Sequence, residues 1–177
     1  MIRAFIAIAV SEPVLRSCEE IIAQLKRLNL QGRFAKTQSM HLTLQFLGNI
    51  EEDQIVGIAE ILEQAGQGVA PFGLKIGQLG IFPQSTHPRV VWIGVEPVDG
   101  LMTLQSKIQQ GLELLGFLKE TRQFHPHLTL LRLKSRKHLG RLIDYLQAEG
   151  PRQQASVLQV EDIHLYQSIL KPEGAEY

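Results

Sequence analysis

The chain has 177 residues, of which 44% are apolar and 20% charged, a composition typical of one large globular domain or of two small lobes sharing a core. Its 18 basic and 18 acidic side chains cancel, so no net positive field favours nucleic acid, and any such contact has to be local. The single cysteine, Cys18, excludes an intrachain disulfide, and no apolar run approaches the roughly 18 residues of a membrane span, so we expect a soluble cytoplasmic protein in which Cys18 packs inside a helix.

The first half of the chain is expected to alternate strands with helices. Residues 5–10 are almost wholly apolar and predict a strand covered on both faces. A helix then begins at the N-cap Ser11 and is predicted to end near residue 32. Residues 40–47 alternate apolar and polar side chains, the period of a half-buried strand, so His41 and the threonine two positions on share one face. A helical period follows over residues 51–64.

The second half repeats much of this order. Its predicted elements are strands over residues 72–76 and 90–95, a helix from Asp99 to about residue 116, a strand over residues 124–133, a helix over about residues 135–146 and a strand over about residues 155–166. The segment from Phe82-Pro83 to Pro88 is predicted to be a turn or loop, and the strands at 72–76 and 90–95 on its two sides are suited to pair as neighbours.

The tetrapeptide His-Leu-Thr-Leu occurs once in each half, at the same place in the order of elements. From Val10 to His41 is 31 positions and from Val95 to His127 is 32, with a strand, a helix and the motif in both cases. We therefore predict a single domain over residues 1–177 with an α+β, duplicated, two-lobed fold. Antiparallel sheets carry helices on the outside, and a central cleft holds the two motifs.

The paired motifs predict acid and base chemistry on a phosphate. Each His-x-Thr places an imidazole and a hydroxyl side by side on a strand. Of two histidines flanking one phosphorus atom, one deprotonates an attacking water and the other protonates the leaving oxygen. The hydroxyls of Thr43 and Thr129 are suited to donate hydrogen bonds to the phosphate oxygens. This scheme requires neither a metal nor a cofactor, and the spacing alone leaves His41 and His127 interchangeable as acid and base.

These residues resemble the paired motifs of the two-histidine phosphoesterase superfamily, most closely its RNA 2′,3′-cyclic phosphodiesterase branch, whose members are also known as 2′-5′ RNA ligases. The resemblance covers nearly the whole chain. Its main carriers are His41-Leu42-Thr43-Leu44 followed by Phe46-Leu47-Gly48, and Phe124-His125-Pro126-His127-Leu128-Thr129-Leu130 followed by Arg132.

The resemblance implies hydrolysis of a terminal 2′,3′-cyclic phosphate on RNA to a 2′-phosphate, with His41 as the proton donor and His127 as the proton acceptor. It also implies substrate contacts from Thr43, Thr129 and Arg132, and a weak, reversible 2′-5′ joining of RNA ends by the same groups. The expected partners are RNA ends or nucleoside 2′,3′-cyclic phosphates, with no membrane and no obligate protein partner. In an unbroken strand Arg132 would face away from His127, so its contact requires that the strand end or bulge first.

Two other functions remain open at this stage. One is a nucleotide- or RNA-binding module of the same fold that holds phosphate without turnover. The other is metal-assisted hydrolysis, with His125 and His127 on one face as two ligands, although local spacing supplies no third.

Several side chains near the motifs admit two interpretations. Phe46 is expected to pack in the core because it shares the parity of Leu42 and Leu44, although an aromatic ring here would also suit stacking on a terminal base. Trp92, in an apolar strand, is likewise expected in the core. The basic run Arg132, Lys134, Arg136 and Lys137 fits either an RNA backbone contact or a solvated helix start.

Overall fold

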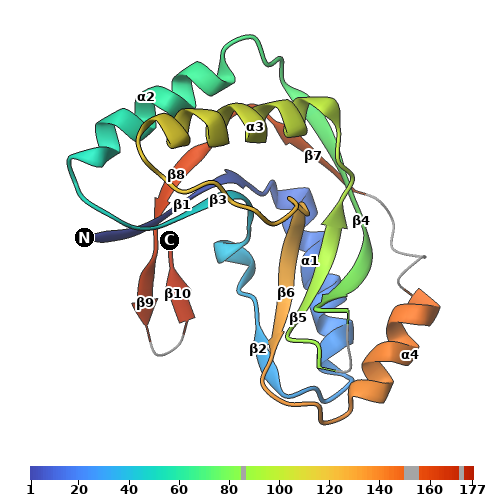
Figure 1. Cartoon of the computed structure of the whole chain (residues 1–177). Coiled ribbons are helices and arrows are strands. Elements are labelled where there is room, and N and C mark those ends of the chain that lie inside the picture. The colour runs from blue at the N-terminus through green and yellow to red at the C-terminus, as the bar shows by residue number, and fades with distance from the viewer. Residues whose placement is uncertain (85–86, 150–155, 172–173) are drawn as a thin grey trace.

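The computed structural model describes residues 1–84, 87–149, 156–171 and 174–177 (Figure 1). Antiparallel strands form two main sheets and a terminal hairpin. The smaller sheet has the order β3 (His41–Ile50), β1 (Ile2–Ala9) and β8 (His164–Gln167). The larger sheet has the order β2 (Gly32–Phe34), β6 (His127–Leu133), β5 (Val90–Val95), β4 (Phe72–Phe82) and β7 (Ser156–Val160). The hairpin pairs β9 (Ile169–Lys171) with β10 (Gly174–Glu176).

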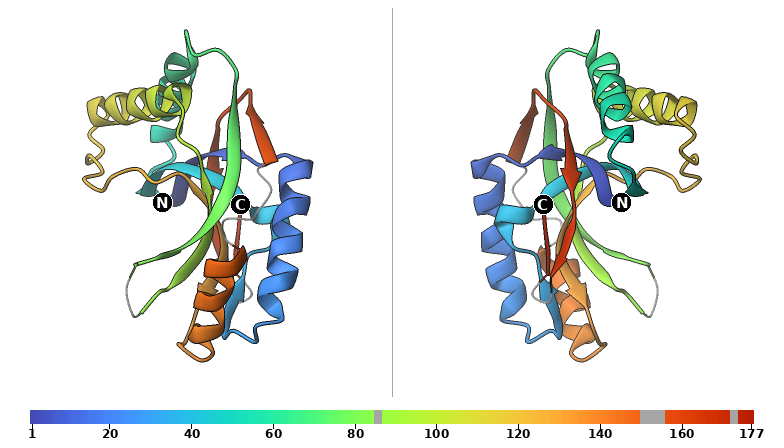
Figure 2. Two further views of the ribbon diagram at one scale, coloured as in Figure 1. Left: turned by 90° about the vertical axis from the view of Figure 1, so that its right-hand side faces the viewer. Right: turned by 90° about the vertical axis from the view of Figure 1, so that its left-hand side faces the viewer.

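The long helices are exchanged between the two halves. The helices are α1 (Glu12–Lys26), α2 (Gln54–Gly66), α3 (Asp99–Leu114) and α4 (Leu139–Glu149), with the short 3-10 helix η1 (Thr37–Ser39). Although α1 follows β1 of the smaller sheet, it contacts β6 and β7 of the larger one, whereas α3 follows β5 and contacts β3. The α2–α3 pair and α1 accordingly lie in different parts of the molecule (Figures 1 and 2). This exchange ties the two sheets together.

One continuous cluster of buried side chains runs beneath both sheets and these helices. Cys18 belongs to it and is fully buried in α1, as predicted. Burial raises the pKa of its thiol to about 11, so this thiol stays neutral and serves packing. Within the described ranges, no helix combines the length and the apolarity needed to cross a bilayer.

The predicted α+β class and the order of elements are confirmed, with corrections at two places. The first helix ends at Lys26 instead of near residue 32, because the chain turns through Asn29, whose φ is +55°, and then forms β2. The predicted single strand over residues 155–166 is wrong. Its two parts, β7 and β8, pair with β4 of the larger sheet and β1 of the smaller one, so the chain crosses between sheets there.

Element bounds also shift around the second motif. The strand predicted from residue 124 begins at His127, because Pro126 lacks the N–H that a ladder position needs. The helix predicted from residue 135 begins at Leu139, after a loop in which His138 has a φ of +62°. The basic run therefore lies along the end of β6 and this loop, and not at a helix start.

A β-bulge interrupts the second motif strand. Thr129 and Leu131 pair with consecutive residues of β5, so Leu130 is the extra residue. Leu130 and Leu131 are both fully buried, and the alternation of the strand reverses after them. The exposed side chain of Arg132 therefore lies on the same face as His127 and Thr129. A bulge before Arg132 was the condition under which this residue could contact the substrate.

The first motif strand has a bulge at the matching position. Thr43 and Gln45 pair with consecutive residues of β1, so Leu44 is the extra residue. As a result Phe46 leaves the buried face and shares the face of His41, with 67% of its surface exposed. The expectation that Phe46 packs in the core is wrong, because it assumed an unbroken alternation along the strand.

Candidate active site

The two motif strands approach each other across the boundary between the sheets. β3 is the edge of the smaller sheet, β6 lies between β2 and β5 of the larger one, and β3 and β6 contact each other. His41 and His127 begin their strands, opposite Ala9 and Gly94 respectively. Both histidines therefore have a small residue as their directly opposite cross-strand partner.

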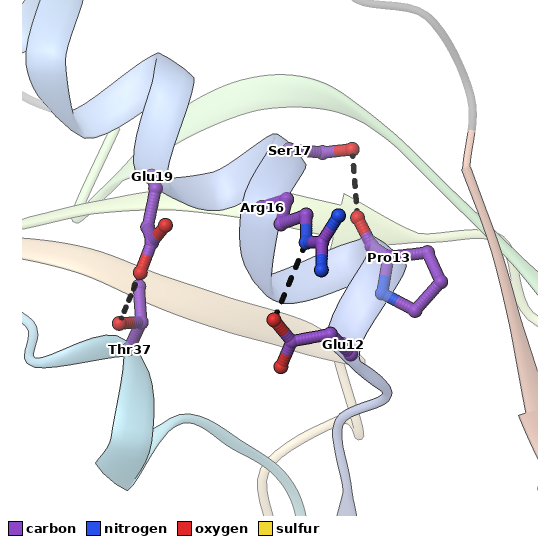
Figure 3. A network of polar contacts seen from close by, with 6 residues as sticks. All are labelled: Glu12, Pro13, Arg16, Ser17, Glu19 and Thr37. Atoms are coloured by element: carbon purple, nitrogen blue, oxygen red, sulfur yellow. Dashed lines mark hydrogen bonds and ion pairs between the residues drawn. The ribbon is translucent and has the colours of Figure 1, made fainter.

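The His41 ring is fixed by the turn before it. Its Nδ1 lies 2.9 Å from the backbone oxygen of Ser39, in η1. A hydrogen bond of 2.8 Å from Thr37 Oγ1 to Glu19 Oε1 joins η1 to α1 (Figure 3). Because a carbonyl oxygen only accepts, Nδ1 carries the proton and the lone pair of the neutral ring lies on Nε2.

The His127 ring is fixed in the same way. Its Nδ1 lies 2.6 Å from the backbone oxygen of His125, again two residues earlier. Nε2 of His127 is therefore the atom available to accept or donate a proton. The two histidines present the same nitrogen, held by the same local hydrogen bond, so either one is chemically able to act as acid or as base.

Aromatic rings pack around both histidines. The ring centroids of Phe5 and Tyr177 lie 4.5 Å and 4.8 Å from that of His41, and Phe5 is 3% exposed. On the other strand, Phe82 lies 5.1 Å from His127 and Trp92 lies 6.1 Å from it. The alternation of the sequence did not reveal these contacts, because the rings come from other strands or from the end of the chain.

The expectation for Trp92 needs correction. This residue pairs with Thr129 on the motif face, while its strand neighbours Val91 and Ile93 are the ones that enter the core. Its ring lies over Gly80 of β4, where a Cβ atom would come within 2.3 Å of the indole. Trp92 thus forms part of the support of His127.

Burial and one arginine lower the pKa of both histidines. Removal of the imidazole from water is the main cause for His41 and for His127, and the backbone hydrogen bond of each ring opposes it. The positive charge of Arg132 lowers the pKa of both rings further. This shared influence places His41, His127 and Arg132 in one electrostatic environment. His125 adds a smaller lowering at His127.

The remaining predicted site residues lie on the same faces, with different cross-strand neighbours. Thr43 is half-buried opposite Ala7, and Thr129 is half-buried opposite the larger Trp92. Arg132 lies directly opposite Arg33 of β2.

The sequence also suggested a metal site at His125 and His127 and an RNA contact along the basic run near β6. In the described part of the chain, no three His, Cys, Asp or Glu side chains are grouped so as to hold a metal ion. What His125 supplies to His127 is its backbone oxygen. Farther along the basic run, Arg136 Nη1 lies 3.1 Å from His87 Nε2.

Comparison with known proteins fits this arrangement. Residues 13–170 match the 2′-5′ RNA ligase superfamily. A protein of Thermotoga maritima named RNA 2′,3′-cyclic phosphodiesterase is 35% identical over 179 residues, covering 99% of this chain and 91% of that protein. One of the same name from Methanothermobacter thermautotrophicus is 30% identical over 176 residues, covering 99% and 95%.

Solved structures agree in fold over the whole chain. The protein TT0787 of Thermus thermophilus superposes with a TM-score of 0.81 at 25% identity, covering 99% of this chain and 93% of that one. E. coli LigT in its apo form gives a TM-score of 0.76 at 25% identity, covering 99% and 92%. The family match, the relatives and the paired motif strands lead to one conclusion: the chain belongs to the 2′-5′ RNA ligase superfamily.

Proposed function

We propose that this protein is an RNA 2′,3′-cyclic phosphodiesterase that opens a terminal cyclic phosphate to a 2′-phosphate. The observation that carries the proposal is the matched pair of histidines, each with Nδ1 held by its own backbone and Nε2 left for a substrate. Relatives with the corresponding name support it. So does the structure of E. coli LigT complexed with 3′-AMP, a nucleotide whose phosphate is on the ribose 3′ oxygen.

The reaction needs one proton to be removed and one to be supplied. Nε2 of His127 accepts a proton from water as its oxygen attacks phosphorus, and the bond between phosphorus and the ribose 3′ oxygen breaks on the opposite side. Nε2 of His41, protonated beforehand, gives its proton to that 3′ oxygen. The product carries a 2′-phosphate, and a proton then passes from His127 back to His41 through solvent. The direction of these roles follows the family resemblance, because the local geometry of the two rings is the same.

The other residues stabilise negative charge. The hydroxyls of Thr43 and Thr129 donate hydrogen bonds to the non-bridging oxygens, one from each motif. Arg132 supplies positive charge on the same face. In the free protein this charge and burial keep both imidazoles neutral near pH 7. A bound phosphate reverses the balance, because its negative charge raises the pKa of both rings and so favours the protonated His41 that the reaction needs.

The same groups suit a joining reaction. If the 5′-hydroxyl of a second RNA takes the place of water, attack on the cyclic phosphate forms a 2′-5′ linkage, and the reverse cleavage passes through the same transition state. We expect this reaction to be slow beside hydrolysis, since water is present at far higher concentration. A 5′-hydroxyl oligonucleotide in large excess, followed by mapping of the new linkage, tests it.

The principal experiment is hydrolysis of a short RNA that ends in a 2′,3′-cyclic phosphate, in excess chelator, with identification of the product. We expect a 2′-phosphate product and a large loss of rate in His41→Ala and in His127→Ala. His138→Ala is the matched control, because the Nδ1 of His138 also lies 2.9 Å from a backbone oxygen, that of Asn29. RNA that binds without turnover would leave a binding module as the function, and activity lost only to the chelator would favour a metal-assisted route.

A further inference from the structure

The outer strand of the smaller sheet, β8, carries a third histidine on the face of the two motifs. Ala7 of β1 pairs with Thr43 on one side and with His164 of β8 on the other, and directly paired residues share a face. Two strand spacings, about 10 Å, separate the backbones of Thr43 and His164. The β1 side chain between them is only the methyl group of Ala7, so His164 is the next polar side chain beside Thr43 in this row.

Ring contacts link His164 to the first motif histidine. Tyr166, two residues further along β8, stacks on Phe5 with ring centroids 5.3 Å apart, and its ring lies 6.1 Å from that of His41. The ring of His164 lies 5.8 Å from that of Tyr166. The side chain of His164 is nevertheless 45% exposed. It therefore stands near the proposed reaction site and is still accessible to a ligand.

An aspartate fixes the protonation of one nitrogen of this imidazole. Nε2 of His164 lies 3.0 Å from Oδ1 of Asp162, in the segment between β7 and β8. Because a carboxylate accepts hydrogen bonds and does not donate them, Nε2 carries a proton. Nδ1 is then the ring atom left for a ligand.

The pair of His164 and Asp162 favours a hydroxyl group over a phosphate. Nδ1 accepts a hydrogen bond when the ring is neutral and donates one when the ring is protonated. A hydroxyl group suits both states because it donates and accepts, whereas a phosphate oxygen only accepts. The carboxylate of Asp162 also repels an anion. Burial raises the pKa of Tyr166 and the charge of Asp162 raises it further, so this negative charge acts on the motif face.

RNA supplies such a hydroxyl one nucleotide before its cyclic end. In the terminal nucleotide the 2′ and 3′ oxygens both belong to the cyclic phosphate. The nearest free 2′-hydroxyl is therefore that of the preceding nucleotide, and a 2′-hydroxyl is the group that distinguishes RNA from DNA.

We propose that His164 and Asp162 form a subsite for the 2′-hydroxyl of the nucleotide that precedes the cyclic end. Nδ1 of His164 makes the hydrogen bond to this hydroxyl while the cyclic phosphate lies between His41 and His127. The proposal rests on the proposed function and adds to it a contact that recognises RNA upstream of the reacting nucleotide.

The test changes one substituent of the substrate. Dinucleotides that end in adenosine 2′,3′-cyclic phosphate carry a hydroxyl, a fluorine or a hydrogen at the 2′ position of the first nucleotide. The fluorine substrate keeps the sugar conformation of RNA without the hydroxyl. Each substrate is tested with the unaltered protein, His164→Ala, His164→Asn and Gln167→Ala. Gln167 is the matched control, because it is exposed on the same strand but has the opposite parity to His164.

In the unaltered protein we expect kcat/KM to be about tenfold higher for the hydroxyl substrate than for the other two, with the difference in KM. His164→Ala should lose this preference by a rise in KM for the hydroxyl substrate alone. His164→Asn should restore most of the preference, because the amide of asparagine occupies the place of Nδ1, and Gln167→Ala should keep it. An equal loss on all three substrates in His164→Ala would overturn the proposal, because His164 would then act on the reaction or on the strand.

A binding measurement separates this proposal from the proposed function. The corresponding dinucleotides that end in a 2′-phosphate are titrated calorimetrically into the same variants, which requires no turnover. Roughly tenfold tighter binding of the hydroxyl compound, lost in His164→Ala, supports the subsite even if the protein hydrolyses nothing. Equal affinity of the unaltered protein for all three compounds would overturn the subsite even if hydrolysis is rapid.

Discussion

The two motif strands share a bulge at the fourth motif residue but carry different side chains beyond it. Each begins with histidine and threonine on one face, and each reverses its alternation after the fourth motif residue. The next side chain to leave the core on that face is Phe46 in the first strand and Arg132 in the second. The repeated part suits the phosphate of the proposed substrate, whereas the divergent part places an exposed aromatic ring on the first strand and a positive charge on the second.

The largest expected effect concerns the histidines, whose local geometry leaves their roles equal. General acid or base catalysis is worth about 10²–10⁴-fold, so His41→Ala and His127→Ala should each lose that much kcat on a natural cyclic phosphate. A substrate with sulfur in place of the leaving 3′ oxygen distinguishes the acid from the base, because a thiolate leaves with little need for protonation by an acid. His41→Ala should then recover to within about tenfold of the unaltered protein, and His127→Ala should not.

Rates on the oxygen and sulfur substrates, measured under single-turnover conditions, check this prediction. Recovery of His127→Ala alone would reverse the assignment of acid and base. Equal recovery of both variants would contradict any division of roles between the two strands.

The next effect concerns Arg132, which the second strand has and the first lacks. Arg132→Gln should lower kcat/KM about 10–100-fold, the range for losing a hydrogen bond to a charged group. The mechanism needs one neutral and one protonated histidine, so the plot of kcat/KM against pH should be bell-shaped. Because the pKa of both histidines lies below the ordinary value of about 6.5, the maximum of this plot should fall below about pH 6.5. Loss of the nearby positive charge raises both pKa values, so the profile of Arg132→Gln should move to higher pH.

Arg136→Gln is the matched control for this substitution, because Arg136 contacts His87 and does not affect the pKa of either motif histidine. The pH dependence of kcat/KM is the measurement. A profile that loses height in Arg132→Gln without moving would mean that the arginine contacts substrate but leaves the histidines unaffected.

A moderate effect tests the support of the second histidine. Gly80→Ala places a Cβ atom within 2.3 Å of the Trp92 ring and forces that ring to shift beside His127. Overpacking of this kind costs about 1–3 kcal/mol, so we expect a lower free energy of unfolding in urea and a lower kcat. Gly66→Ala, at the end of α2 with nothing within 4 Å of the new Cβ, should instead gain about 0.4–1 kcal/mol and keep kcat. Equal stability in the two variants would show that Trp92 moves aside freely.

These comparisons also show where sequence reasoning succeeds and where it stops. Periodicity located the motif strands and the α+β order, since alternation and helical spacing are local properties of the chain. It missed the bulges, because Leu44 and Leu130 are ordinary apolar residues and the extra residue is visible only in the pairing with β1 and β5. Phe46 was therefore assigned to the wrong face, and the position of Arg132 stayed open.

The remaining errors have a long-range cause. The exchange of α1 and α3 between the sheets, and the crossing of the chain from β7 to β8, depend on packing partners far away in sequence. The rings of Phe82 and Tyr177 reach the histidines in the same way. The local periodicity of the sequence does not indicate which distant segments pack together. A motif that occurs twice, in contrast, predicts that its two copies lie close together in the fold.

The smallest expected effect concerns the residue two positions before each motif histidine, Ser39 ahead of the first strand and His125 ahead of the second. Both act through a backbone oxygen, so His125→Ser should preserve the hydrogen bond to Nδ1 of His127 and make the second strand like the first. Removing the charge that His125 can carry raises the pKa of His127 slightly, which should shift the pH profile of kcat/KM by a small amount to higher pH and change its maximum less than about threefold.

The same variant separates the metal-free reaction from a metal-assisted one. If His125 and His127 were ligands of one ion, His125→Ser would remove a ligand, and activity would fall by orders of magnitude and depend on added metal. Kinetics of the variant with chelator and with added zinc therefore decide between a side chain that holds a metal and a backbone oxygen that orients a ring. His41 makes the matching contact with the backbone oxygen of a serine, Ser39, and this favours the second.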